Sequence, residues 1–171
     1  MNESRKMIYL CLAHMSEEGL EQKYIQEAFD TNWVVPLGPN VNAFEEDLKQ
    51  FHGNEKEVVA LCSGTAAVHM ALIACGVQAG DEVCVQSFTF CASSHPITYL
   101  GATPVFIDSE KDTWNMDPDL LEQAIEDRIA KTGKKPKAII PVALYGMPYD
   151  CERIMAVAQK YDIPVIEDAA E

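Results

Sequence analysis

Two stretches of this chain combine residue types that could do chemistry. The first is the turn Ser63-Gly64-Thr65, which stands between the apolar residues 58–60 and a helical pattern at residues 66–75. With Thr65 as the helix N-cap, the turn presents backbone N–H groups and hydroxyls at the positive end of the helix dipole. This arrangement can bind a phosphate group, although the same pattern is more often an ordinary joint between a strand and a helix.

The second stretch is the acidic run near residue 171. Val165 and Ile166 predict a short buried strand, and Glu167 and Asp168 follow it directly. Ligands of open α/β sheets bind beyond the carboxyl ends of the strands. A phosphate cradle combined with such an aspartate suits a ligand with a phosphate at one end and a basic ring nitrogen at the other. Pyridoxal 5'-phosphate (PLP) is such a ligand, because a carboxylate beside its ring nitrogen keeps that nitrogen protonated.

A rival interpretation of the acidic run is nucleotide hydrolysis. An apolar strand that ends in acidic residues is also typical of the magnesium-binding strand of P-loop NTPases, with Asp168 as the metal ligand. The sequence contains no G-x-x-x-x-G-K-[ST] motif, so this rival lacks its phosphate-binding half.

Aromatic residues stand in two segments where a ligand could meet them. Phe88 and Phe90 follow a predicted strand at residues 81–86 and could cover a flat ring, although one of the two is expected in the core. Trp33 lies in a loop at residues 31–39 that is marked by Pro and Gly. Its side chain is either a plug for the core or a contact for a ligand or partner.

The elements that must position these residues alternate along the chain. Periodicity and capping residues predict helices at residues 16–30, 41–51, 66–75, 93–100, 117–130 and 150–161. Short apolar runs predict strands at residues 58–60, 81–86, 103–108, 138–142 and 165–166. Strands that alternate with helices through short joints indicate an α/β fold with a mostly parallel sheet.

Composition narrows the possible partners. The chain has 171 residues, 48% hydrophobic and 23% charged, with a net charge of −14. This charge disfavours nucleic acid and anionic membranes, because both require a basic surface. The six cysteines form no C-x-x-C pair, which favours buried free thiols in a reducing compartment and hence a cytoplasmic protein. The apolar residues 7–13 are at the short limit for a signal peptide and run into His14, Glu17 and Glu18, which argues against one. No run approaches the length of a membrane span.

Five motifs together resemble the DegT/DnrJ/EryC1/StrS family of PLP-dependent sugar-nucleotide aminotransferases. In chain order they are SGTAA at 63–67, SFTF at 87–90, GATPVFID at 101–108, LYG at 144–146 and IEDAAE at 166–171. The resemblance extends from about residue 16 to residue 171. The loop at residues 36–38 and the DAAE sequence are most similar to the branch that aminates UDP-linked 4-keto-6-deoxy sugars, such as the bacillosamine-type transaminases.

This resemblance implies a fold and a set of cofactor contacts. The fold is the large domain of PLP-transferase fold type I, like that of aspartate aminotransferase, here an incomplete three-layer sandwich. Gly64 and Thr65 match the contacts to the cofactor phosphate, and Phe90 matches the aromatic that stacks on the PLP ring. Asp168 matches the partner of the pyridine nitrogen, and Glu171 matches the polar residue near the ring hydroxyl.

The resemblance also implies substrates and partners. Asn32, Trp33, Val34 and Val35 match a segment that contacts the sugar nucleotide. The reaction of the family passes an amino group from glutamate to PLP and then to the keto carbon of a nucleotide-linked sugar. A homodimer is expected, since active sites in this family take residues from both subunits.

The lysine that forms the Schiff base with PLP has no match in this sequence. In the family it lies beyond the Asp-Ala-Ala motif, and none of the ten lysines here stands in that context. We therefore expect residues 1–171 to be an N-terminal segment plus part of the PLP-binding large domain, without the rest of that domain and the small C-terminal domain. Such a chain would be inactive alone. The alternative is a non-catalytic binding or assembly module derived from the family, whose unpaired last strand would favour pairing with another chain.

Overall fold

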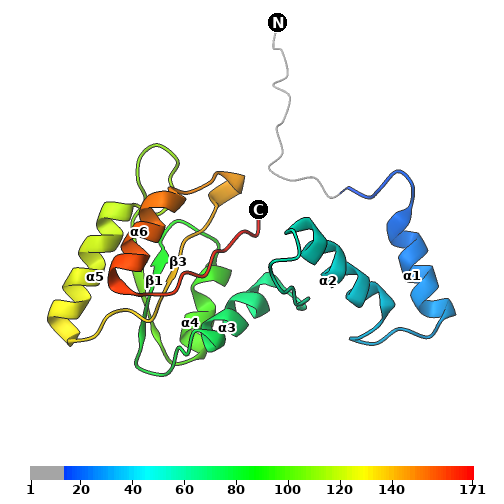
Figure 1. Cartoon of the computed structure of the whole chain (residues 1–171), viewed down its shortest axis with the longest axis horizontal. Coiled ribbons are helices and arrows are strands. Elements are labelled where there is room, and N and C mark those ends of the chain that lie inside the picture. The colour runs from blue at the N-terminus through cyan, green and yellow to red at the C-terminus, as the bar shows by residue number, and fades with distance from the viewer. Residues whose placement is uncertain (1–13) are drawn as a thin grey trace, which may run out of the picture. The chain divides into compact units, whose positions relative to one another are not determined.

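The structure of the chain is a computed structural model that describes residues 14–171 (Figure 1). The chain forms two compact units, Met1–Ala60 and Leu61–Glu171. The first unit contains α1 (Leu20–Asp30) and α2 (Pro39–Phe51), with the loop of residues 31–38 between them. The second unit contains the sheet and the remaining helices, and it therefore carries most of the predicted site residues.

Both helices of the first unit begin at other residues than the sequence predicts. The hydroxyl of Ser16 accepts from the Leu20 amide at 2.8 Å and donates to Glu21 at 2.6 Å. Gly19 has a left-handed φ of 68°, so the predicted helix of residues 16–30 starts only after this turn. In contrast, α2 starts two residues earlier than predicted, because Pro39 occupies the first helical position, where its missing N–H is not needed.

The strand predicted at residues 58–60 is wrong. These residues have no regular secondary structure, and the Ala60 amide donates to the carboxylate of Glu45 at 2.8 Å instead of to a strand. Three apolar residues form a strand only where a neighbouring strand supplies hydrogen bonds, and no such neighbour exists among residues 14–171.

The sheet of the second unit is parallel, as predicted. It contains β1 (Glu82–Gln86), β2 (Thr103–Ile107) and β3 (Ala138–Ile140) in the order β2-β1-β3. The predicted strand at residues 165–166 is present only as two parallel bridges, Ile139 to Val165 and Val142 to Asp168. These bridges still carry ladder bonds, because the Asp168 amide donates to Pro141 at 3.0 Å. They bring Asp168 to the carboxyl end of β3.

Helices cover both faces of this sheet and make three layers (Figure 1). Along β1, Val83 and Val85 pack into one core, and Cys84 packs into the other. The first core includes residues of α3 (Gly64–Ala74) and α4 (His95–Tyr99), and the second includes residues of α5 (Pro118–Thr132) and α6 (Cys151–Tyr161). This alternation explains why the strands are apolar on both sides. The arrangement confirms the predicted α/β sandwich.

Capping residues fix where α5 and α6 begin. Asp117 accepts from the amides of Asp119 and Leu120 at the start of α5, and Asp150 accepts from the Arg153 amide at the start of α6. The helix predicted at residues 93–100 is divided into a 3₁₀ turn, Cys91–Ser93, and α4. A second 3₁₀ turn, Leu144–Gly146, follows β3. Both turns lie at the carboxyl end of the sheet and shape the region described next.

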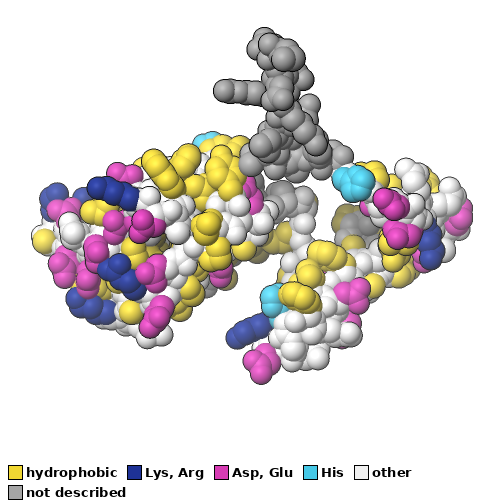
Figure 2. Space-filling model, turned by 90° about the horizontal axis from the view of Figure 1, so that it is seen from above, with side chains coloured by type: hydrophobic (Ala, Val, Ile, Leu, Met, Phe, Trp, Pro, Cys, Tyr) yellow, Lys and Arg dark blue, Asp and Glu magenta, His cyan; other side chains and the backbone are white. Residues whose placement is uncertain are grey.

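Opposite charges alternate over the end of the second unit that carries α5 and α6 (Figure 2). Lys160 pairs with Glu122 at 2.6 Å across the two helices, and Arg153 pairs with Asp119. Within residues 14–171, none of the helices has the length and apolar character that crossing a membrane requires.

Candidate functional site

The N-terminus of α3 presents unpaired backbone amides, but its cap is not the predicted one. Ser63 is the N-cap, with extended backbone angles of φ −166° and ψ 159°, and its hydroxyl accepts from the Ala66 amide at 3.2 Å. Thr65 already lies inside the helix, so its hydroxyl is not used for capping. In the described part of the chain, the amides of Gly64 and Thr65 have no hydrogen-bond partner. The amides of Gly64 and Thr65 and the hydroxyl of Thr65 are therefore available to bind an anion.

All five residues predicted to contact the cofactor line one pocket. It has a volume of about 240 Å³ and lies where α3 begins and where β1 and β3 end. Its lining consists of Gly64, Thr65, Thr89, Phe90, Ala92, Val142, Leu144, Asp168, Ala170 and Glu171. The fold therefore brings together residues from segments that are far apart in the sequence.

Hydrogen bonds hold the Asp168 side chain from the side of β1. The Ser93 hydroxyl donates to Asp168 Oδ2 at 2.6 Å, and Thr89 Oγ1 lies 2.9 Å from Ser93 Oγ. Ser93 is 1% exposed, whereas Thr89 and Asp168 are half-buried, so the central hydroxyl of this arrangement is buried. Sequence reasoning missed Ser93, because a serine that follows a strand gives no sign of a carboxylate that is distant in the chain.

The two phenylalanines after β1 have different surroundings. Phe90 lines the pocket and is 77% exposed, so its ring is available to a flat ligand. Phe88 does not line the pocket and meets Trp114 edge to face, with the ring centroids 6.2 Å apart. Phe88 is also exposed, so the expectation that one of the two phenylalanines lies in the core is wrong. Of the two predicted candidates, Phe90 is therefore the one placed to cover a ligand.

A buried phenol lies near the acidic run. Tyr149 is 7% exposed. Its burial, together with the charge of Glu167, raises the pKa of the Tyr149 phenol. The phenol therefore remains protonated and neutral through the physiological pH range.

Among residues 14–171, no group of three His, Cys, Asp or Glu side chains could hold a metal ion.

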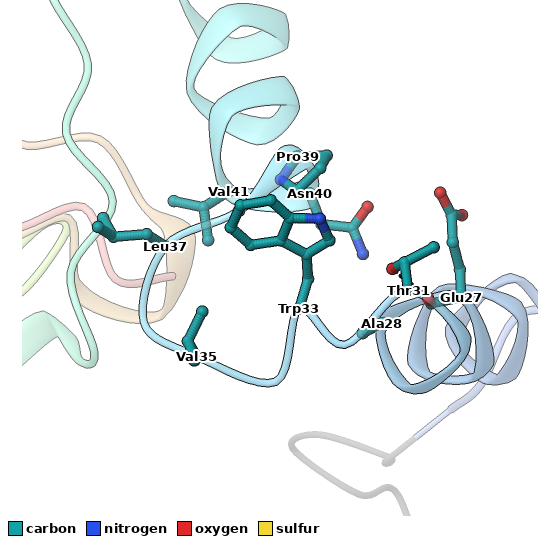
Figure 3. A pocket seen from close by; sticks show the side chains of 10 residues that line it. Glu27, Ala28, Thr31, Trp33, Val35, Leu37, Pro39, Asn40 and Val41 are labelled. Carbon is teal, nitrogen blue, oxygen red and sulfur yellow. Dashed lines mark hydrogen bonds between the residues drawn. The ribbon is translucent and has the colours of Figure 1, made fainter.

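The predicted sugar-nucleotide segment lies in the first unit. The Trp33 indole stands between the end of α1 and the start of α2 (Figure 3). Trp33 and Val35 line a small hollow of about 50 Å³, whereas Asn32 and Val34 do not line it. The hollow is too small for a nucleotide-linked sugar. Trp33 is 49% exposed, so it is not a complete core plug.

The groups around the pocket fit the chemistry of PLP. Free amides and a hydroxyl at the start of α3 suit a phosphate, Phe90 offers a flat apolar face, and Asp168 offers a negative charge for a ring nitrogen. A Cβ added to Gly64 would meet no atom within 4 Å, so open space borders this residue. The volume of about 240 Å³ lies below the range of typical ligand sites, which is on the order of 300–1,000 Å³.

A parallel sheet with helices on both faces, an anion-binding helix start and an aspartate at the strand ends define the cofactor-binding part of an α/β enzyme. The model of the DegT/DnrJ/EryC1/StrS aminotransferase family matches residues 15–171, and the chain belongs to this family. Its members and their solved structures are PLP-dependent aminotransferases, which confirms the predicted family and cofactor class.

Named relatives share this sequence over nearly all of its length. The chain is 53% identical over 166 residues to "Putative pyridoxal phosphate-dependent aminotransferase EpsN" of Bacillus subtilis (strain 168), covering 97% of this chain and 42% of that protein. It is 42% identical to GDP-perosamine synthase of Caulobacter vibrioides, covering 90% and 39% of the two chains. The crystal structure of NtdA from Bacillus subtilis with bound cofactor PMP has a TM-score of 0.80 and 31% identity, covering 91% and 34%. The chain thus spans about two fifths of the curated relatives.

Proposed function

We propose that this chain is the N-terminal, cofactor-binding part of a PLP-dependent aminotransferase that aminates a nucleotide-linked keto sugar. The observation that carries this proposal is the pocket shared by Gly64, Thr65, Phe90, Asp168 and Glu171. Each of these residues has the type that its proposed role requires, and family membership supplies the reaction class.

Each side of the pocket has a distinct task in this proposal. The amides of Gly64 and Thr65 bind the phosphate, and the exposed ring of Phe90 covers one face of the cofactor and excludes water. The Asp168 carboxylate holds a proton on the ring nitrogen, and the hydrogen bond from Ser93 fixes the orientation of this carboxylate. PLP, when bound, supplies an electron sink that allows an amino group to move between an amino acid and a carbonyl carbon. Glu171 is proposed to lie near the ring hydroxyl.

The substrates are inferred from the relatives and from the loop of residues 31–38. Relatives are named as a GDP-perosamine synthase and as an aminotransferase of a UDP-linked 3-oxo sugar, which supports a nucleotide-linked keto sugar as amino acceptor. Glutamate is proposed as the amino donor from the reaction of the family. Asn32, Trp33, Val34 and Val35 are proposed to contact that substrate. The cofactor-binding lysine and the small domain are proposed to come from protein outside these 171 residues, and the active assembly to be a cytoplasmic homodimer.

A titration of the chain with PLP tests the cofactor half of the proposal. Asp168→Asn removes the charge at the ring nitrogen, and we expect the Kd for PLP to rise about tenfold or more, since a charged hydrogen bond contributes about 1.5–3 kcal/mol. Glu167→Gln is the matched control, because Glu167 is the adjacent acid and does not line this pocket. Equal Kd values for the two variants, or no PLP binding by the unaltered chain, would contradict the assignment.

Amino transfer is tested with the whole protein that contains this chain. Incubation with glutamate and a UDP-linked 4-keto-6-deoxy sugar should yield 2-oxoglutarate and the amino sugar. The 171-residue chain alone should yield neither, because it holds no matching lysine. Cofactor binding by the whole protein without turnover of any nucleotide-linked keto sugar would favour the non-catalytic module instead.

A further inference from the structure

Two amide side chains are fully buried at the carboxyl end of the sheet. Gln86 is the last residue of β1, and Asn115 lies in the loop between β2 and α5. Both are 0% exposed, and their amide groups are 3.4 Å apart, with Gln86 Nε2 donating to Asn115 Oδ1. Buried amides are retained where their hydrogen bonds are satisfied, so the partners of this pair show what it holds.

The remaining partners are main-chain groups from three loops. Gln86 Nε2 donates to the Phe88 carbonyl at 3.0 Å, and Gln86 Oε1 accepts from the Met116 amide at 2.9 Å and the Val142 amide at 3.4 Å. Asn115 Oδ1 accepts from the Leu144 amide at 3.0 Å, and Asn115 Nδ2 donates to the Met147 carbonyl at 2.8 Å. The pair therefore joins the loops that follow β1, β2 and β3.

Two of these loops form walls of the pocket. Thr89 and Phe90 directly follow the anchored Phe88, and Val142 and Leu144 are themselves anchored. Neither Gln86 nor Asn115 lines the pocket, so neither side chain is in position to touch a ligand there. Their effect on a ligand must pass through the main chain that they hold.

We propose that Gln86 and Asn115 are positioning residues, which fix the Thr89–Phe90 wall relative to the Val142–Leu144 wall and thereby set the affinity of the pocket. The identity of the ligand, a phosphorylated pyridine, rests on the proposed function. The positioning of the two walls does not rest on the proposed function, because the hydrogen bonds from the pair to the main chain exist without a ligand.

The first experiment measures hydrogen exchange in the 171-residue chain without ligand. Gln86→Met and Asn115→Leu keep similar size but remove the hydrogen bonds. We expect exchange at the Met116 amide to accelerate about tenfold or more in Gln86→Met, and at the Leu144 amide in Asn115→Leu. The Ile166 amide, which donates to Ile139 at 2.9 Å in the sheet ladder, should be unaffected. Equal acceleration at Ile166 would indicate general destabilisation and would overturn the proposal.

The second experiment measures the Kd for PLP in the two single variants and in the double variant. Each single variant should raise the Kd about fivefold or more, and the double variant should be within about twofold of either single, because residues that act as one unit are not additive. Ile125→Val is the control, since Ile125 is fully buried on α5 in a core that contains no residue lining the pocket. An effect of Ile125→Val as large as that of the single variants would overturn the positioning role.

The two experiments also separate this inference from the proposed function. If the unaltered chain does not bind PLP, the proposed cofactor and the effect on its affinity are both wrong, and hydrogen exchange still decides whether the pair fixes the walls. Should Gln86→Met not fold, Asn115→Leu provides both measurements at the Leu144 wall. Normal exchange and unchanged Kd in that variant would contradict the inference.

Discussion

Ser93 Oγ and Asp168 Oδ2 are joined by a hydrogen bond of 2.6 Å, although 75 positions separate the two residues in the sequence. An ionised carboxylate only accepts, so the single hydroxyl proton of Ser93 is directed to Asp168. Thr89, 2.9 Å from Ser93 Oγ, must then donate to Ser93. The three side chains form a directed chain of hydrogen bonds that starts at the pocket wall and ends on the carboxylate.

Removal of the Ser93 hydroxyl should weaken PLP binding through Asp168. Ser93→Ala leaves one carboxylate oxygen without its donor and the carboxylate less well oriented. We expect the Kd for PLP to rise about tenfold, which corresponds to the roughly 1.5 kcal/mol of a charge-assisted hydrogen bond. Isothermal titration of the chain measures this. Ser94→Ala is the control, since the Ser94 hydroxyl donates to Cys91 and has no bond to Asp168. A Ser93→Ala variant that binds as tightly as Ser94→Ala would refute the positioning of Asp168 by Ser93.

Gly64→Ala separates ligand space from protein stability. Gly64 is the only one of the nine glycines without a positive φ, and a Cβ there would meet no atom within 4 Å. Alanine should therefore stabilise the chain by about 0.5 kcal/mol, because it restricts the unfolded state. A methyl group beside the free amides should nevertheless raise the Kd for PLP about tenfold, or about 1.4 kcal/mol.

The comparison of PLP with pyridoxal is the control for this variant. Pyridoxal lacks the phosphate, so its Kd should be the same for Gly64→Ala and for the unaltered chain. An equal loss of affinity for both ligands would place the phosphate elsewhere in the pocket.

Local sequence signals predicted the elements that depend on neighbouring residues. Asp117 and Asp150 were identifiable as starts of helices, because a cap is a contact with an amide two or three residues away. The N-cap of α3 was misplaced, since both Ser63 and Thr65 are residue types that cap helices. Only the extended backbone of Ser63 decides between them. The apolar run at residues 58–60 failed as a strand for lack of a distant partner.

The candidate site was predictable as a set of residues but not as a network. The motifs that contain Gly64, Phe90 and Asp168 are visible in the sequence, and the parallel sheet brings them to one pocket. The bonds from Ser93 to Asp168 and from Gln86 to Asn115 connect residues that share no periodicity or spacing rule. Such pairs arise from the register of the strands, which sequence patterns do not specify.

Thiol labelling should distinguish the buried cysteine of β1 from the exposed ones. Burial raises the pKa of the Cys84 thiol to about 12, and Cys84 is 0% exposed. Cys62, Cys91 and Cys151 are exposed. With iodoacetamide at pH 8, we expect Cys84 to react on the order of 100-fold more slowly than these three, since only the accessible thiolate attacks. Peptide mass spectrometry gives the rate at each residue.

Denaturant provides the control for this labelling. In 6 M guanidinium, Cys84 should react as fast as the others, and early labelling of Cys84 in the folded chain would contradict its place in the core. Because an unfolded thiol titrates near about 8.5 and the folded one near 12, the free energy of unfolding should also fall as the pH rises above about 8.5.

The ion pair between α5 and α6 should give stability over a defined pH range. Lys160 Nζ lies 2.6 Å from Glu122, and this hydrogen bond lowers the pKa of Glu122 and raises the pKa of Lys160. The contribution of Glu122 is present above its unfolded pKa of about 4.3 and is lost as the pH falls through its lowered folded value. The contribution of Lys160 is present below about 10.4 and is lost as the pH rises through its raised folded value.

Glu122→Gln should therefore lower the Tm by about 1–3 °C at pH 7, with the difference from the unaltered chain vanishing toward pH 3. Thermal unfolding followed by circular dichroism measures this. Added salt at 1 M should reduce the difference, because both side chains are partly exposed to solvent. Glu152→Gln is the control, since Glu152 lies on the same helix pair and makes no ion pair within residues 14–171. A Tm difference for Glu122→Gln that persists unchanged at pH 3 would show that packing, and not the charge of Glu122, joins the two helices.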